Sequence, residues 1–389
     1  MIPYATQDIT EEDIAAVNAV LRSPLITQGL AVTEFERAIG DYCGAQYATA
    51  VNSATSALHL ACLALGLKAG DRLWTTAVSF VASANCGRYC GASIDFIDID
   101  PVTYNLSVSA LETRLEQAQQ QGKLPKIIVA VHLAGQSCDM QSIHALSQQY
   151  GFKIIEDASH AIGGQYRGIP IGRCQYSDIC VFSFHPVKII TTGEGGIAVT
   201  NQADLAKSMA RLRSHGITRD EDAFLHLADG PWNYEQQALG FNYRITDFQA
   251  ALGISQLKRL DQYIAERHRL AERYTQAFQH LPLTLPSIAQ DCYSAFHLYI
   301  ILIPLKQGFD HLAIFKGLRQ MGIGVNLHYI PIYKQPYYRA LGFTSDYCPN
   351  AERYYQQAIT LPLFPSLSDE KQDYVIECVS SLLTNEVQP

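Results

Sequence analysis

The stretch that organises this chain runs from residue 179 to residue 200 and reads ICVFSFHPVKIITTGEGGIAVT. Two mainly apolar runs, 179–182 and 197–200, lie on either side of a polar turn that carries one lysine, Lys188. The pattern predicts two buried strands joined by a turn that holds the lysine in an apolar interior. A buried ammonium is costly, but a desolvated amine is also a nucleophile that forms Schiff bases with carbonyl compounds. The alternative is a lysine that only extends from a strand end towards water.

Upstream of this stretch, short apolar runs alternate with helical patterns. Strands are expected at 48–51, 72–76, 93–99, 127–132 and 153–155. Helical segments separate them, which is typical of βαβ units, and the continuous apolar run before His132 fits a strand buried on both faces. The sequence therefore predicts the α/β class, with a doubly wound and mainly parallel sheet whose ligands bind beyond the carboxyl ends of the strands.

Two domains are expected. Residues 1–250 would form the large α/β domain, and residues 251–389 a smaller C-terminal α+β domain. One long helix is predicted from Thr246 to about Phe278, just before two prolines. Residues 216–239 are polar and irregular, and a loop of that length suggests a functional or interfacial segment.

Two further signals stand at predicted strand ends. Thr55 and Ser56 open a helix directly after a strand, so backbone N–H groups and two hydroxyls could bind an anion there. The alternative for either residue is a plain helix N-cap. Asp157 ends the strand at 153–155 and could pair with a protonated ring nitrogen, and His160 is three positions further on. For Asp157 the alternative is a surface carboxylate, and for His160 a structural histidine.

Composition limits the partners of the chain. The net charge is −8 and no basic block occurs, which argues against nucleic acid or an anionic membrane surface as the main partner. No apolar run approaches the roughly 20 residues of a membrane span, and the first residues do not resemble a signal peptide. None of the ten cysteines forms a CxxC pair, so no metal site is expected and reduced thiols in the cytoplasm are the simplest account.

Lys188, Asp157 and the Thr55–Ser56 turn together fit one cofactor. They offer an amine for an aldehyde, a carboxylate for a ring nitrogen and donors for a phosphate, with Ser183 as a further phosphate donor. Pyridoxal 5′-phosphate carries all three groups, and proteins bind it through a lysine with an acidic partner at the pyridinium nitrogen. The joint match favours Lys188 as the residue that carries pyridoxal phosphate.

These motifs give the chain a clear family resemblance along essentially its whole length. It resembles the sugar aminotransferases of the DegT/DnrJ/EryC1/StrS family, which are fold-type I pyridoxal-phosphate enzymes. The stretches that carry the resemblance are 52–58 (NSATSAL), 156–161 (EDASHA), 183–188 (SFHPVK), 192–196 (TGEGG) and 240–244 (GFNYR). Residues 189–190, Ile-Ile, depart from the proline-containing form expected after the lysine.

The resemblance implies a role for each matching side chain. Lys188 would bind the cofactor and move protons, Asp157 would pair with the pyridine nitrogen, and His160 would lie near the phenolic oxygen. The other implied cofactor-binding residues are Thr55, Ser56, Phe80, Ser183 and, from the neighbouring subunit of a homodimer, Asn242. The implied substrate-binding residues are His185, Arg244, His328 and Tyr329.

The resemblance also implies a reaction. L-Glutamate would donate its amino group to C4 of a UDP-linked 4-keto-6-deoxy-N-acetylhexosamine, because the stretches 183–188 and 326–333 resemble the branch that serves pseudaminic acid biosynthesis. One alternative is a dTDP- or GDP-linked 4-ketosugar as acceptor. Another is a dehydratase of the family, which would carry histidine at the position of Lys188. A third is a regulatory member that binds the cofactor without turnover, which the intact Lys188, Asp157 and Asn242 disfavour.

Overall fold

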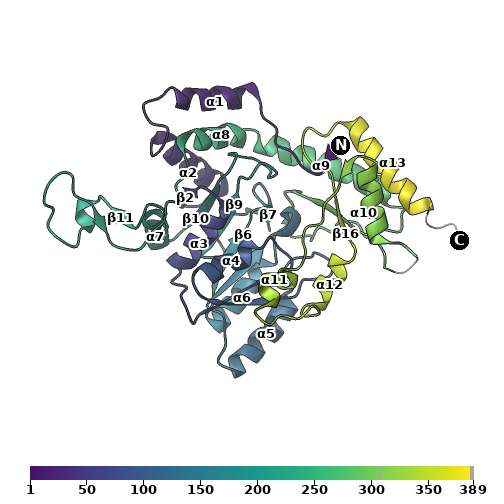
Figure 1. Cartoon of the computed structure of the whole chain (residues 1–389), viewed down its shortest axis with the longest axis horizontal. Coiled ribbons are helices and arrows are strands. Elements are labelled where there is room, and N and C mark those ends of the chain that lie inside the picture. The colour runs from purple at the N-terminus through teal and green to yellow at the C-terminus, as the bar shows by residue number, and fades with distance from the viewer. Residues whose placement is uncertain (306–307, 386–389) are drawn as a thin grey trace.

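A seven-stranded sheet forms the centre of the computed structural model, which describes residues 1–305 and 308–385 (Figure 1). Only β10 runs antiparallel to its neighbours, and all other adjacent strands are parallel. In spatial order the strands are β2 (Tyr47–Val51), β10 (Gly196–Thr200), β9 (Ile179–Ser183), β6 (Lys153–Asp157), β5 (Ile127–Val131), β3 (Arg72–Thr76) and β4 (Ser93–Ile97). The predicted mainly parallel α/β sheet is therefore confirmed.

Helices cover both faces of this sheet. On β5, Ile127 and Val129 pack towards one helical layer and Ile128 and Ala130 towards the other, so all four side chains are buried. The first layer contains α3 (Ala54–Ala64), α4 (Ala82–Tyr89) and α7 (Ala203–Arg213). The opposite layer contains α2 (Leu30–Cys43), α5 (Val108–Gln120), α6 (Met140–Tyr150) and α8 (Asp247–Leu257), and α1 (Glu11–Leu21) packs on α8. A doubly wound arrangement explains why the β5 run is apolar throughout.

The smaller domain is built around the second half of α9 (Leu260–Phe278). Leu260 and Ile264 near the start of α9 pack in the core of the large domain, whereas Leu270 and Phe278 pack in the core of the smaller one. The expected division between residues 250 and 251 falls within α8, and the division itself stays a prediction. The other elements of the smaller domain are β14 (Tyr299–Leu302), α10 (His311–Gln320), β15 (Ile323–Gly324), α11 (Pro336–Arg339), α12 (Pro349–Tyr355), β16 (Ala358–Leu361) and α13 (Asp369–Asn385).

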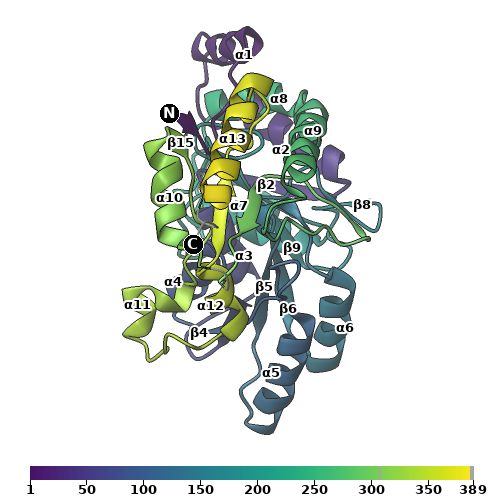
Figure 2. The same ribbon diagram turned by 90° about the vertical axis from the view of Figure 1, so that its right-hand side faces the viewer.

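The first residues of the chain also belong to the smaller domain. Strand β1 (Ile2–Pro3) pairs in parallel with β15, beside α10 (Figure 2). The following residues bring Tyr4 to the ring of His328, at a centroid distance of 5.0 Å. The N-terminal segment therefore helps to build the cleft between the two domains.

Two predicted elements differ in the structure. The long helix expected from Thr246 to Phe278 is divided at Lys258 and Arg259, where Arg259 turns to bind Asp13 with an N–O distance of 2.6 Å. The strand expected at 324–329 is shorter, because only β15 and a single bridge from Asn326 to Thr360 are paired.

The irregular segment 216–239 forms an arm that projects from the body of the molecule beyond α7 (Figure 1). Two short strands, β11 (Ile217–Thr218) and β12 (Glu235–Gln236), close its base. A separate small sheet joins β13 (Cys292–Tyr293), β7 (Gln165–Tyr166) and β8 (Ile169–Pro170).

Candidate active site

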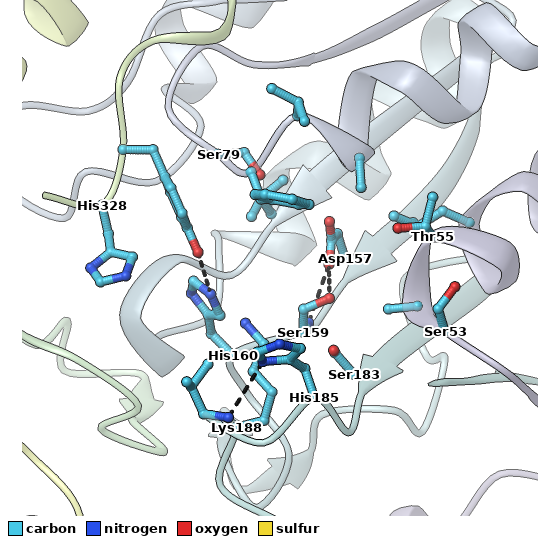
Figure 3. A pocket seen from close by; sticks show the side chains of 18 of the residues that line it. Ser53, Thr55, Ser79, Asp157, Ser159, His160, Ser183, His185, Lys188 and His328 are labelled. Atoms are coloured by element: carbon cyan, nitrogen blue, oxygen red, sulfur yellow. Dashed lines mark hydrogen bonds between the residues drawn. The ribbon is translucent and has the colours of Figure 1, made fainter. Parts of the chain in front are cut away.

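Lys188 lies in the turn between β9 and β10, as the flanking apolar runs predict. The two strands pair with Ser183 opposite Gly196, and the turn is closed by the Thr191 hydroxyl and the Thr192 N–H, which donate to the Phe184 carbonyl at 2.9 and 3.0 Å. The turn presents the Lys188 side chain to a cavity of about 940 Å³ (Figure 3). Burial lowers the pKa of Lys188 to about 8, although the nearby Asp157 carboxylate acts in the opposite direction. The lysine is thus a partly deprotonated amine near neutral pH, which is the form that attacks carbonyls.

The cavity lies where the two domains meet. Its floor is formed by the ends of β9 and β6 with the first turn of α3, and its opposite wall by residues 326–330 of the smaller domain. Figure 3 shows Asp157 between Thr55 and Ser53 on one side and Lys188 and His160 on the other. The ends of distant segments therefore form a single site at the carboxyl edge of the sheet.

The start of α3 forms one side of the cavity and offers a cradle that could bind an anion. Ser53, and neither Thr55 nor Ser56, is the N-cap residue, since its hydroxyl oxygen accepts the Ser56 N–H at 3.2 Å. The plain N-cap alternative for Thr55 and Ser56 is therefore wrong. The Ser56 hydroxyl donates to the Asn52 side-chain oxygen at 2.7 Å, and both residues line the cavity with Thr55.

Gly196 allows β10 to pack directly against the start of α3. A methyl group on Gly196 would lie 2.4 Å from the Ala54 nitrogen, so only glycine lets the strand approach the start of α3 so closely. The turn that carries Lys188 and the helix that could bind a phosphate are consequently packed directly together.

Two serines hold the Asp157 side chain in place. One oxygen accepts the Ser83 hydroxyl at 2.6 Å, and the other accepts the hydroxyl and N–H of Ser159 at 2.6 and 3.2 Å. The residue is 5% exposed and lines the cavity. Three hydrogen bonds fix its orientation and satisfy part of its charge in a buried position.

His160, Tyr329 and His328 form the wall nearest Lys188. The His160 Nε2 is 3.0 Å from the Tyr329 hydroxyl, and the His328 Nδ1 is 2.9 Å from the Thr360 hydroxyl. Burial, together with the Lys188 charge, lowers the pKa of His328 to about 3 and holds the pKa of His160 well below its usual range. Both histidines are therefore neutral, and they can donate or accept hydrogen bonds but carry no charge.

The other predicted site residues fall into two groups. Ser183, His185 and Phe80 line the cavity; Phe80 is 57% exposed, and its ring centroid is 6.3 Å from that of Tyr329. Asn242 and Arg244 do not line it. They lie in an extended strip beside the end of β2, where Arg244 pairs with Val51, and the Asn242 side chain is exposed.

Several polar residues of the cavity were missed from the sequence. These are Tyr4, Ser53, Ser79, Ser159 and Gln335. Ser83, which donates to Asp157 but does not line the cavity, was missed as well. Ser159 had a detectable signal, because a residue two positions after an aspartate commonly donates to its side chain. Ser83 had none, since its contact with Asp157 depends on how α4 packs on the sheet.

The fold and the site define a class of protein. Residues 7–380 match the DegT/DnrJ/EryC1/StrS aminotransferase family, and the chain belongs to this family of pyridoxal-phosphate-dependent sugar aminotransferases of fold-type I. The chain is 36% identical to UDP-4-amino-4,6-dideoxy-N-acetyl-beta-L-altrosamine transaminase of Campylobacter jejuni over 385 residues, which cover 98% of each chain. It is also 36% identical to the spore coat polysaccharide biosynthesis protein SpsC of Bacillus subtilis over 386 residues, 98% of this chain and 97% of that one.

A solved structure resembles the chain equally closely. Helicobacter pylori PseC, described as an aminotransferase involved in the biosynthesis of pseudoaminic acid, superposes with a TM-score of 0.90 at 32% identity and 99% coverage of both chains. Within residues 1–305 and 308–385, no helix has the length and apolar composition needed to cross a membrane.

Proposed function

We propose that this aminotransferase moves the amino group of L-glutamate to C4 of UDP-2-acetamido-2,6-dideoxy-β-L-arabino-hexos-4-ulose. The product would be UDP-4-amino-4,6-dideoxy-N-acetyl-β-L-altrosamine, for pseudaminic acid biosynthesis. The observation that carries the proposal is the buried, partly deprotonated Lys188 in a cavity shared with Asp157 and the α3 cradle. The Campylobacter transaminase and PseC support the choice of sugar, because each matches nearly the whole chain.

The cavity fits pyridoxal phosphate by the chemistry of its donors. Lys188 would hold the cofactor through its aldehyde, and the first turn of α3, with Thr55, Ser56 and Ser183, would hold its phosphate. Asp157 would keep the ring nitrogen protonated, and Phe80 would pack on the ring. The cofactor supplies an electron-accepting ring that stabilises negative charge next to the amino group.

Proton transfer would be carried out by residues of the chain. The Lys188 amine would take a proton from Cα of glutamate and would later deliver one to C4 of the sugar. Its pKa of about 8 suits both directions, since an acid–base group works best with a pKa near the working pH. The serines around Asp157 would keep that side chain in place.

The substrate-binding residues are proposed because they lie in the same cavity as Lys188. His185, His328 and Tyr329 line the outer part of the same cavity as Lys188, where a sugar nucleotide would have to enter. Arg244, which lies outside the cavity within one chain, would act from the neighbouring subunit. The proposal places the enzyme in the cytoplasm, where its ten free thiols would remain reduced.

A homodimer with shared sites accounts for the two residues that lie outside the cavity. Asn242 is exposed beside β2, close in sequence to the projecting arm 216–239, and in a dimer it would reach the cofactor phosphate of the partner. The arm itself carries large apolar side chains in the open, with Leu227 98% and Trp232 74% exposed. Exposed apolar groups of this size suit a protein contact.

The central role of Lys188 is tested by trapping the cofactor. The purified protein should be yellow, L-glutamate should bleach it, and borohydride should link the cofactor to the peptide that contains Lys188. Lys188→Ala should lose the linked peptide and all amination, whereas the exposed lysine variant Lys207→Ala should keep both. A cofactor linked to any other peptide would overturn the assignment.

The substrate is tested with a panel of acceptors. Mass spectrometry should detect glutamate-dependent amination of the UDP-linked N-acetyl-4-ketosugar, with dTDP- and GDP-linked 4-ketosugars as controls. Amination of only the dTDP- or GDP-linked sugar would overturn the proposed substrate and leave the aminotransferase class intact. A protein that binds the cofactor but aminates none of the sugars would behave as a regulatory member of the family.

A further inference from the structure

In the hydrogen bond between His160 and Tyr329, the structure indicates which residue donates and which accepts. His160 is buried, and each ring nitrogen has one partner: the Ala134 backbone nitrogen lies 3.3 Å from Nδ1, and the Tyr329 hydroxyl lies 3.0 Å from Nε2. The second contact is the dashed line at His160 in Figure 3. The ring of His297 packs against His160 at a centroid distance of 4.4 Å.

The Ala134 contact decides where the imidazole proton is. A backbone N–H can only donate, so the Nδ1 of His160 must present its lone pair. A neutral ring then carries its proton on Nε2, and this N–H donates to the oxygen of Tyr329. Burial and the neighbouring Lys188 charge hold the pKa of His160 well below its usual range, which keeps the ring in this neutral form.

The backbone around Ala134 is strained in the conformation that makes this contact. Ala134 has φ 59° and ψ 3°, a left-handed conformation that is unfavourable for a non-glycine residue. The segment 295–298 holds it there, because Ala295 and Leu298 donate to the carbonyls of Gly135 and Ala134 at 2.9 and 3.3 Å. Strain of this kind persists where the surroundings impose it, often at functional sites.

The direction of the second hydrogen bond leaves the Tyr329 proton available. Because the hydroxyl oxygen accepts from His160, its own hydrogen must point elsewhere, and the oxygen has no other hydrogen bond within the described part of the chain. Tyr329 lines the cavity with Lys188. Burial raises the pKa of Tyr329 well above its usual value, so the phenol keeps its proton at any working pH.

We propose that Tyr329 donates a hydrogen bond to an oxygen atom of the ligand bound in the cavity, and that His160, fixed by Ala134, is the positioning residue that aims this hydroxyl. The identity of the ligand rests on the proposed function. The acceptor is an anionic or carbonyl oxygen, which could belong to the cofactor ring or to the amino-acid or sugar substrate. Tyr329 then supports charge on that oxygen without becoming charged itself.

The tautomer of His160 can be measured in the cofactor-free protein. Long-range proton–nitrogen NMR spectra of protein labelled with ¹⁵N-histidine, with His160 assigned by its loss in His160→Asn, should show the proton on Nε2 from pH 6 to pH 8. A proton on Nδ1, or a charged ring at pH 7, would overturn the proposal. This measurement does not depend on the enzyme having any particular substrate.

A double-mutant cycle tests whether His160 acts through Tyr329. Tyr329→Phe should weaken cofactor binding, or reduce kcat/KM for glutamate or ketosugar, by about 10-fold, the effect of one hydrogen bond. A loss in cofactor affinity identifies the cofactor oxygen as the acceptor, and a loss confined to one half-reaction identifies that substrate. No loss in any of the three measurements would overturn the proposal.

The second arm of the cycle changes His160. His160→Asn, which can still accept from Ala134 but no longer reaches Tyr329, should cause a similar loss in the wild-type background and less than a 2-fold loss in the Tyr329→Phe background. His160→Gln, which restores an N–H towards the tyrosine, should recover most of it. Equal losses in both backgrounds would overturn the positioning role.

Matched controls come from residues outside the cavity. Tyr337→Phe and His280→Asn change the same types of side chain on the exposed surface, and we expect less than a 2-fold effect from either. If the wild-type enzyme aminates no ketosugar, the proposed function fails, whereas the NMR spectrum and the cofactor affinities still decide the roles of His160 and Tyr329.

Discussion

Gly196→Ala should be the most damaging small substitution near the site. The added methyl group would lie 2.4 Å from the Ala54 nitrogen, 2.5 Å from the Ser53 carbonyl carbon and 2.6 Å from the Ala54 Cα. These separations are about 1 Å shorter than an ordinary contact between such atoms. All three atoms are backbone, so no side chain can rotate away, and either β10 or the first turn of α3 must shift.

The magnitude follows from how firmly both partners are held. Overpacking in a well-packed core typically costs 1–3 kcal/mol. Strand β10 is paired on both sides, with β2 and with β9, so we expect the upper end, about 3 kcal/mol of unfolding free energy. Gly193→Ala is the matched control in the same turn. Gly193 has φ 78° and no atom within 4 Å of the added methyl group, so only the left-handed strain of about 1 kcal/mol applies.

Urea unfolding of the two cofactor-free variants measures this difference. Because either shift changes how β10 and the start of α3 lie against each other, the affinity of Gly196→Ala for pyridoxal phosphate should fall as well, whereas Gly193→Ala should keep the wild-type affinity. Equal urea midpoints and equal cofactor affinities for the two variants would show that β10 and α3 are not in the close contact on which the reasoning depends.

Three further predictions concern buried charge and assembly. Lys188→Met should stabilise the cofactor-free protein at pH 7 by up to about 3 kcal/mol, because a lysine whose pKa falls from 10.5 to about 8 on folding destabilises the fold below pH 8. This gain should vanish as the pH rises from 8 towards 10.5. A difference in urea unfolding that does not depend on pH would contradict the prediction. Arg267→Leu should lower the free energy of unfolding by about 3–5 kcal/mol, since the fully buried guanidinium donates to three backbone carbonyls. The exposed control Arg269→Leu should lower it by less than about 1 kcal/mol. Similar melting temperatures for the two variants would refute this prediction. Mixing Lys188→Ala with Asn242→Ala subunits should restore about a quarter of the wild-type activity if each site takes Asn242 from the partner, because half of the randomly paired dimers regain one complete site. If the subunits are shown to exchange and no activity returns, shared sites are ruled out.

The parts of the fold that local pattern controls were predictable. The strand at 127–131 and its helical neighbours follow from apolar runs and spacing, and so does the hairpin around Lys188. The break between α8 and α9 was not predictable, because the sequence there contains neither proline nor glycine. It depends on Arg259 reaching Asp13, nearly 250 positions earlier in the chain. Tertiary contacts override helical propensity at such points.

The candidate site likewise contains residues that the sequence could predict and residues that it could not. Lys188 and Asp157 could be found because each follows a buried strand, and parallel strands bring their carboxyl ends to one edge. Ser83 could not, since it lies inside a helix and meets Asp157 only after α4 packs on the sheet. The direction of the His160–Tyr329 hydrogen bond also requires the folded turn at Ala134, which sequence alone does not reveal.

The pairing of β1 with β15 has a consequence for the order of events during synthesis. Ile2 leaves the ribosome some 320 residues ahead of its partner Ile323. At about 5–20 residues per second, the first strand must wait roughly 15–60 s for its neighbour. Tyr4, which follows that strand and contacts His328, cannot take its place in the cavity wall earlier. The large domain can therefore form its sheet during translation, whereas the cleft is completed only when nearly the whole chain has emerged.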